Sequence, residues 1–265
     1  MEKPVYLNPL EHDDLVTRLL APFFPRYRVL RALDAYPASL RGPLRNLVMT
    51  LDRKFLFLRN LKCGCTSISQ LMYYYSMGAF YPRHIHRARK GVHLARYDWR
   101  EIEPVYKNHD AVVFTFSRDP EARAYSAFTN FFVDQNNLAT HNHMEGMRAH
   151  GFSEDRPESE NFDVFLDYVE HGLEIDPLRT SAHFRPQVIN IAYGQVDYDF
   201  IGKLERIETD LPHVFEMGGR PGFPPPDVLS QRFNSSQAER APLSEAQRRR
   251  VRDIFAADYE AFGYD

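Results

Sequence analysis

Short apolar runs alternate with segments of helical periodicity along most of this chain. Runs with the length and composition of buried strands occur at residues 54–61, 111–117 and 198–204. Apolar residues at helical spacing predict helices at residues 66–77, 98–107, 161–171, 206–217 and 244–262, the last opened by a capping box of Ser244 and Gln247. Strands separated by helices indicate an α/β fold, with a central, mostly parallel sheet flanked by helices on both faces.

The remaining segments have weaker patterns. Residues 11–51 are amphipathic in pieces but interrupted by prolines, which predicts a helical N-terminal extension over residues 1–53. Residues 81–97 have no clean period and are expected to form a loop. Residues 134–160 are polar and are expected to form an insert or a mobile lid. Since neither a repeat nor a linker is evident, we expect a single domain over residues 1–265.

Composition narrows the class of protein. The chain has 265 residues, 43% of them hydrophobic, which is ample for a core. Its net charge of −3 argues against a general nucleic-acid binder. The N-terminus has no signal-peptide pattern and no apolar run is long enough to cross a bilayer, so we expect a cytoplasmic protein without a membrane span. Cys63 and Cys65 are too close for an ordinary disulfide and too few for a zinc site, so we expect reduced thiols.

The segment Lys62-Cys63-Gly64-Cys65-Thr66-Ser67 lies where the first predicted strand gives way to a helix. Such a turn presents backbone N–H groups, two hydroxyls and the positive end of a helix dipole at one point, which suits a phosphate-like dianion. Gly64 lets the backbone approach the anion without an intervening Cβ. The lysine precedes the glycine, so the segment is not a Walker A motif. A solvated turn is the alternative explanation.

A second motif follows the strand at residues 111–117. Arg118 stands at its carboxyl end, where ligands bind in open α/β sheets. Asp119-Pro120 then starts a helix, with the aspartate as N-cap and the proline at the first helical position, and Ser126 lies about two turns further on. Two anion sites on neighbouring strand ends suggest a doubly phosphorylated nucleotide. A surface ion pair between Arg118 and Asp119 is the alternative.

Together these motifs resemble the signatures of sulfotransferases that use 3′-phosphoadenosine 5′-phosphosulfate (PAPS), and most closely the branch that contains the Golgi carbohydrate sulfotransferases. The likeness continues through His183–Gln187 and Tyr198–Glu205 to Asp258–Tyr264. It implies a P-loop-like three-layer sandwich and the transfer of a sulfuryl group to a hydroxyl of a carbohydrate or sugar-bearing acceptor. Leu61 stands where many relatives have proline, and we expect the chain to lack the membrane anchor of the Golgi members. We therefore expect a soluble, bacterial member whose acceptor is open.

The resemblance also implies roles for single residues. Lys62 to Ser67 would bind the 5′-phosphosulfate, with Lys62 stabilising charge on the leaving phosphate. Arg118 and Ser126 would hold the 3′-phosphate, and Asn234, Ser235 and Ser236 would close over the nucleotide. The released product would be adenosine 3′,5′-bisphosphate. Because in-line transfer depends on positioning and charge stabilisation, no metal is required.

The proton acceptor is expected to be a histidine. In related uronyl-type carbohydrate sulfotransferases the base lies on the segment before the Arg-Asp-Pro strand, and Gly91-Val92-His93-Leu94 fits that position best. His84, His86, His183 or a carboxylate are the alternatives. The block His183-Phe184-Arg185 either binds an anionic acceptor or packs a helix against the sheet.

Two other functions stay open at this point. A P-loop-type kinase or another phosphate-transfer protein would use a similar turn, and dependence on magnesium would reveal it. A non-catalytic relative would keep the nucleotide site without the chemistry. The expected partners are small hydroxyl-bearing molecules and not nucleic acids, and the oligomeric state is open.

Overall fold

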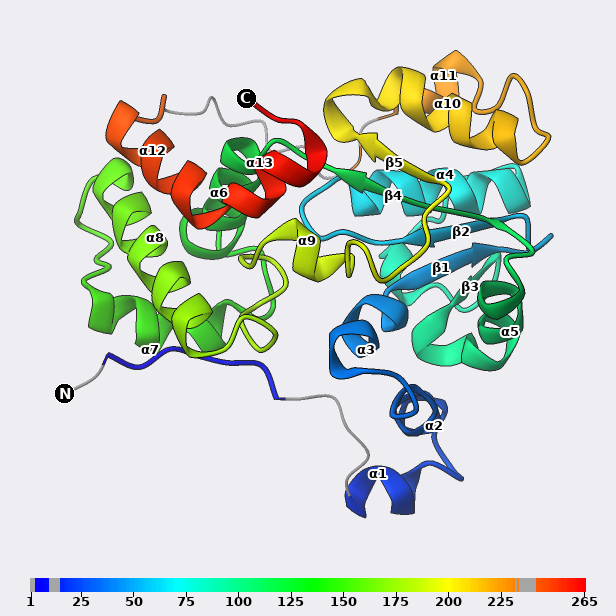
Figure 1. Cartoon of the computed structure of the whole chain (residues 1–265), viewed down its shortest axis with the longest axis horizontal. Helices are drawn as coiled ribbons and strands as arrows, with labels where there is room; N and C mark the ends of the chain where they lie inside the picture. Colours follow the sequence, from blue (N-terminus) through cyan, green and yellow to red (C-terminus); the bar gives the residue numbers. More distant parts are fainter. Residues whose placement is uncertain (1–2, 10–14, 232, 234–241) are drawn as a thin grey trace. The chain divides into compact units, whose positions relative to one another are not determined.

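The computed structural model describes residues 3–9, 15–231, 233 and 242–265 (Figure 1). The chain forms two compact units. The sheet unit comprises residues 11–117 and 190–235, and the helical unit comprises residues 1–10, 118–189 and 236–265. That residues 1–265 form one domain stays a prediction.

The sheet unit is built on one five-stranded sheet. Its strands are β1 (Leu47–Thr50), β2 (Phe55–Leu58), β3 (Val92–Leu94), β4 (Val112–Ser117) and β5 (Phe200–Lys203), in the order β3-β1-β2-β4-β5. Strands β2, β4 and β5 are parallel to one another, whereas β1 runs antiparallel to both of its neighbours, β2 and β3. All strands except β1 therefore point the same way, which confirms a mostly parallel sheet.

Helices cover the sheet on both faces (Figure 1). The helices of this unit are α1 (Leu15–Leu20), α2 (Pro25–Leu33), α3 (Ala38–Arg45), α4 (Cys65–Met77), α5 (Ala95–Asn108), α10 (Ile207–Met217) and α11 (Pro226–Leu229), with single 3-10 turns η1 (Ile85–Arg87) and η3 (Leu204–Arg206). Ile68 of α4 and Phe215 of α10 are buried in one apolar cluster with Phe55 of the sheet, whose ring centroid lies 4.5 Å from that of Phe215. Helix α5 packs against β1 and β3.

The helical unit has an aromatic core. Its helices are α6 (Pro120–Phe128), α7 (Thr140–His150), α8 (Glu158–Ile175), α12 (Glu245–Ile254) and α13 (Ala256–Phe262), with a π-helical turn η2 (Thr129–Val133). Helix α9 (Gln187–Asn190) begins at the end of this unit. The rings of Phe128, Phe162, Phe165 and Phe184 are buried together, and their contacts are edge to face, tilted or stacked. The predicted insert at residues 134–160 contributes α7 to this packed unit, and a lid function stays a prediction.

Most predicted elements are confirmed, and two predictions are wrong. The extension is helical only as far as Arg45, because residues 47–50 form β1. The predicted loop at residues 81–97 contains η1 and β3. Strand β1 directly follows a segment with a helical pattern and β3 has only three residues, so neither was recognised, and both form because each pairs with a neighbour. The last helix has the predicted Ser244–Gln247 capping box but breaks at Phe255.

Candidate functional site

The turn between β2 and α4 has a backbone that depends on glycine. Lys62 and Gly64 both adopt left-handed conformations, with φ of 68° and 72°, and Gly64 is the N-cap of α4. A Cβ at Gly64 would lie 2.5 Å from Cδ1 of Leu204. Glycine is therefore favoured at this position both by the dihedral angle and by the close approach of Leu204.

The first turn of α4 is suited to an anion. Gly64 provides no side-chain cap, and the first N–H groups of any helix lack acceptors within the helix itself. These groups and the helix dipole favour negative charge at this point. Cys63 is fully buried and its N–H donates to the carbonyl of Asn60 at 3.2 Å, so this residue shapes the turn. Both cysteines are free thiols, as predicted.

The two hydroxyls of the turn have different partners. Thr66 Oγ1 lies 3.1 Å from Nε2 of His86. Ser67 Oγ donates to the carbonyl of Phe233 at 3.5 Å. The contact between Thr66 and His86 was not evident from the sequence, because the two residues are 20 positions apart and η1 has no periodic signal.

Behind Thr66 lies a buried arginine. Arg59, only 3% exposed, donates from Nε and Nη2 to the backbone and side-chain oxygens of Asn46, at 3.0 and 3.2 Å. Its Nη1 lies 2.9 Å from Nδ1 of His86. Burial and the neighbouring Arg96 lower the pKa of Arg59 to about 10, so the guanidinium is charged at neutral pH. Burial and the charge of Arg59 lower the pKa of His86 to about 3.

The ends of β2 and β4 meet at one edge of the sheet. Thr115 Oγ1 donates to the carbonyl of Leu58 at 2.8 Å, and Asn60 Nδ2 donates to the carbonyl of Phe116 at 3.1 Å. The Lys62 turn therefore starts beside the carboxyl end of β4. Ser117 ends β4, and Arg118 is the next residue of the chain.

In the helical unit, the backbone of Arg118 is held by Gln187. The side-chain amide of Gln187 accepts from the Arg118 N–H at 2.9 Å and donates to its carbonyl at 2.8 Å. Asp258, fully buried, accepts from the N–H groups of Gln187 and Val188 at 2.8 and 2.9 Å. The sequence blocks that contain Arg118, Gln187 and Asp258 are thus joined by hydrogen bonds within the helical unit.

The start of α6 is as predicted. Asp119 is the N-cap and accepts from the N–H of Ala122 at 2.7 Å, with Pro120 at the first helical position. Ser126 is half-buried within this helix. Arg123 is buried and donates to the carbonyls of Ala182 and Arg185, so it stabilises the unit from within.

The candidate histidines lie in different surroundings. His93 is half-buried on β3 and pairs with Met49, which pairs in turn with Leu56 of β2, so its side chain projects to the sheet face opposite α4. His84 is exposed, and its ring centroid lies 6.2 Å from that of His86. His183 packs edge to face on Phe131 in the helical unit, with centroids 5.0 Å apart.

The block His183-Phe184-Arg185 is largely built into the core. Phe184 belongs to the aromatic cluster of the helical unit. Arg185 is 8% exposed and its Nη1 donates to the carbonyl of Leu178 at 2.5 Å. Burial lowers the pKa of Arg185 to about 10, which leaves it charged at neutral pH. These contacts favour the packing alternative for this block over acceptor binding.

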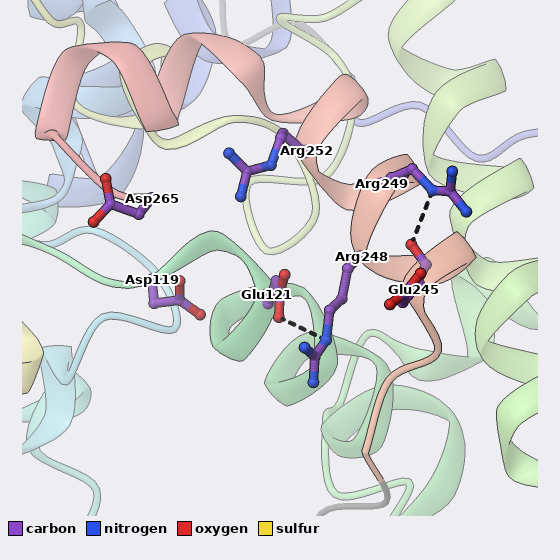
Figure 2. Close-up of a pocket in the computed structure, with 7 residues that line it drawn as sticks. All are labelled: Asp119, Glu121, Glu245, Arg248, Arg249, Arg252 and Asp265. Carbon is purple, nitrogen blue, oxygen red and sulfur yellow. Dashed lines mark hydrogen bonds and ion pairs between the residues drawn. The ribbon is translucent and has the colours of Figure 1, made fainter.

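A cavity of about 510 Å³ lies in the helical unit beside the start of α6 (Figure 2). It is lined by Asp119, Glu121, Glu245, Arg248, Arg249, Arg252 and Asp265. Arg248 Nε lies 3.8 Å from Glu121 Oε2. The arginines of this cavity are balanced by carboxylates. Arg250 forms ion pairs with Asp167 and Glu170. The three consecutive arginines at residues 248–250 therefore do not form a site for a polyanion.

The remaining expectations concern the residues proposed to close over the nucleotide, a metal site and a membrane span. Asn234, Ser235 and Ser236 lie outside the described residues. Over residues 3–9, 15–231, 233 and 242–265, no group of three or more His, Cys, Asp or Glu side chains is placed to hold a metal ion. Within the same ranges, no helix has the length and apolar character needed to span a membrane.

Comparison with known proteins gives a consistent picture. The model of a family described as "Sulfotransferase family" matches residues 45–265. Carbohydrate sulfotransferase 14 from Danio rerio is 32% identical over 111 residues, which are 41% of this chain and 30% of the relative. The human carbohydrate sulfotransferase 14 is 26% identical over 235 residues, which are 83% of this chain and 60% of the relative.

Mouse carbohydrate sulfotransferase 12 is 30% identical over 172 residues, 57% of this chain and 39% of the relative. The chain thus covers between 30% and 60% of the length of these three relatives. No solved structure matches the chain significantly.

Proposed function

Because the chain belongs to the sulfotransferase family, we propose that it transfers the sulfuryl group of PAPS to a hydroxyl of a carbohydrate or sugar-bearing acceptor. Family membership and the names of the relatives support the reaction class and the kind of acceptor. The relatives are longer than this chain, so activity and acceptor are both part of the proposal.

The main support is the turn between β2 and α4. It has a lysine, a glycine N-cap without a side-chain cap and a threonine at the first turn of a 13-residue helix. It also begins beside the carboxyl end of β4, from which Arg118 follows. In the proposal, the turn holds the 5′-phosphosulfate, while Arg118 and Ser126 hold the 3′-phosphate of the same nucleotide.

The proposed chemistry is an in-line displacement at sulfur. The acceptor oxygen forms a bond to sulfur as the bond from sulfur to the bridging phosphate oxygen breaks. Negative charge grows on the bridging oxygen, and Lys62 together with the α4 N–H groups stabilises it. The acceptor hydroxyl gives its proton to a base. Loss of such a charge-stabilising donor typically slows turnover by about 10²–10³.

We propose His93 as that base, following the resemblance, and His84 as the competing candidate. His84 is exposed close to His86, and His86 contacts Thr66 of the turn. His86 itself is a poor base, because its pKa is lowered to about 3.

The proposal is tested with PAPS labelled in its sulfate group and a panel of saccharides and simple alcohols. We expect labelled product with at least one saccharide, no requirement for magnesium, and formation of product about 10²–10³-fold more slowly with K62A. Transfer of phosphate from ATP that depends on magnesium would instead establish a kinase. Tight nucleotide binding without product from any acceptor on the panel would favour a non-catalytic relative.

The roles of the two motifs are separated by binding. Calorimetric titration with adenosine 3′,5′-bisphosphate is expected to show a much larger loss of affinity for R118A than for K62A, because this product retains the 3′-phosphate but lacks the sulfate. Equal affinities of R118A and the parent protein would overturn the assignment of the 3′-phosphate pocket.

A further inference from the structure

The contact between Arg59 and His86 fixes where the imidazole carries its proton. A guanidinium has N–H donors and no acceptor. Nη1 of Arg59 lies 2.9 Å from Nδ1 of His86, so Nδ1 must accept this hydrogen bond through its lone pair. A neutral imidazole that accepts at Nδ1 carries its hydrogen on Nε2.

The second imidazole nitrogen then determines whether the Thr66 hydroxyl donates or accepts in its hydrogen bond with His86. Nε2–H of His86 donates to Oγ1 of Thr66 across 3.1 Å. The hydroxyl oxygen therefore acts as acceptor toward His86, and the hydroxyl hydrogen of Thr66 points away from the imidazole. Thr66 is the second residue of α4, in the turn where the N–H groups face an incoming anion.

The other tautomer would have the opposite effect. With the hydrogen on Nδ1, two donors would face each other between His86 and Arg59, and Thr66 would have to donate its hydrogen to Nε2. A phosphate-like ligand would then meet a hydroxyl lone pair. Arg59 prevents this arrangement, and Asn46 holds Arg59 in place through both of its oxygens.

Protonation of the ring is opposed by the same surroundings. The charged or titratable groups that act on His86 are Arg59, His84 and Arg96. Together with burial they lower the pKa of His86 to about 3. The ring is thus neutral at every pH at which the protein is expected to work.

We propose that His86 is a positioning residue, which orients the Thr66 hydroxyl as a hydrogen-bond donor toward the 5′-phosphate end of the bound nucleotide. The proposal rests on the proposed function in one respect, namely that the Lys62 turn faces this nucleotide. The Arg59–His86–Thr66 chain of hydrogen bonds is defined by its own geometry in the sheet unit.

The tautomer is tested without any ligand. In the whole chain with ¹⁵N-labelled histidine, the ring-nitrogen signals of His86 are assigned by their loss in H86Q. We expect a neutral ring with the hydrogen on Nε2, unchanged between about pH 5 and 8. A ring that titrates near its ordinary pKa of about 6.5, or that carries its hydrogen on Nδ1, would overturn the proposal.

The effect on the site is tested by a double-mutant cycle, with adenosine 3′,5′-bisphosphate as the ligand. H86L and T66V are each expected to weaken binding about tenfold, the size of one hydrogen bond to a charged group. H86L is expected to have no further effect in the T66V background, since it acts through the hydroxyl. Effects that multiply in the double variant would show that His86 does not act through Thr66.

Two matched controls complete the experiment. H86Q is expected to bind within about threefold of the parent, because a glutamine amide can accept from Arg59 and donate to Thr66. T66S keeps the hydroxyl and is expected to bind almost normally. If the parent protein does not bind the bisphosphate, the proposed function fails. The tautomer measurement still decides whether Thr66 accepts a hydrogen bond from His86 or donates one to it.

Discussion

The side chain of Gln187 pairs with the backbone of Arg118 in the way that one strand pairs with another. Its amide accepts from the Arg118 N–H at 2.9 Å and donates to the Arg118 carbonyl at 2.8 Å. Gln187 is itself fixed, because Asp258 accepts from its N–H at 2.8 Å. The backbone of Arg118 is thus held between the end of β4 and the start of α6 by residues from two distant parts of the sequence.

The first prediction concerns this pairing. Q187L leaves an N–H and a carbonyl of Arg118 without their buried partner, and we expect a loss of about 1–3 kcal/mol in unfolding free energy. If Arg118 holds the 3′-phosphate, affinity for adenosine 3′,5′-bisphosphate should fall as well, by about tenfold. Urea unfolding and calorimetric titration measure the two effects.

The control for this variant is Q195L, because Gln195 is exposed and Q195L removes only a solvent-exposed hydrogen bond, which Gln195 accepts from Ser39. It should change the unfolding free energy by less than about 0.5 kcal/mol. Normal bisphosphate affinity in a folded Q187L would mean that the backbone position of Arg118 does not matter for the nucleotide.

The second prediction concerns Gly64. In G64A, alanine must adopt a φ near 72° and its Cβ must displace Leu204, so we expect a loss of about 1–2 kcal/mol in stability. The displaced turn should also bind the bisphosphate more weakly. G78A is a matched control, since Gly78 has a φ of 71° but nothing within 4 Å of its Cβ position.

G78A should therefore lose only the stability that the left-handed conformation costs an alanine, and its nucleotide affinity should be unchanged. Adding L204A to G64A should restore part of the stability by removing the contact. Equal losses of nucleotide affinity in G64A and G78A would mean that the close approach of Leu204 has no bearing on the site.

Features that depend on neighbouring residues in the sequence were predictable here. The Asp119-Pro120 helix start and the Ser244–Gln247 capping box depend on residues within one helical turn, and both are confirmed. Strand β1 was missed because it directly follows a segment with a helical pattern, and β3 because it has only three residues.

In the candidate site, too, only the features that depend on neighbouring residues in the sequence were predictable. The Lys62 turn was predictable, because a strand, a glycine and a helix start follow one another in the sequence. The contacts that orient it were not, since His86 reaches Thr66 from an irregular segment, and Gln187 is 69 residues away from Arg118. Such contacts are set by tertiary packing, which leaves no periodic trace in one sequence.

The third prediction separates the candidate bases. H93Q is expected to lower kcat for sulfuryl transfer by about 10²–10⁴, the usual contribution of a general base, with little change in bisphosphate affinity. H84Q should retain most of the activity. Steady-state kinetics with PAPS and the best acceptor measure both variants.

A control histidine is available in His109, which is exposed and has a φ of 54°, a conformation that asparagine tolerates. H109N should behave like the parent. A large loss of kcat in H84Q, with normal kcat in H93Q, would transfer the role of base to His84.

The fourth prediction is a loss of stability in acid that originates at His143. This histidine is buried among aromatic rings, with Nδ1 2.8 Å from the hydroxyl of Tyr168, and burial together with nearby His141 lowers its pKa from 6.5 to about 4. Between these values the unfolded chain binds more protons than the folded protein. The stability contributed by the neutral ring is therefore complete above about pH 6.5 and is lost as the pH falls toward 4.

The full effect amounts to about 3 kcal/mol, from the 1.36 kcal/mol that corresponds to each pKa unit. Urea unfolding at pH 7.5, 6 and 5 should therefore show a steeper decline for the parent than for H143Q, which cannot gain a proton at this position. H141A is the control, because His141 is exposed and contributes only through its charge. Parallel pH profiles of H143Q and the parent would show that acid destabilisation arises elsewhere in the chain.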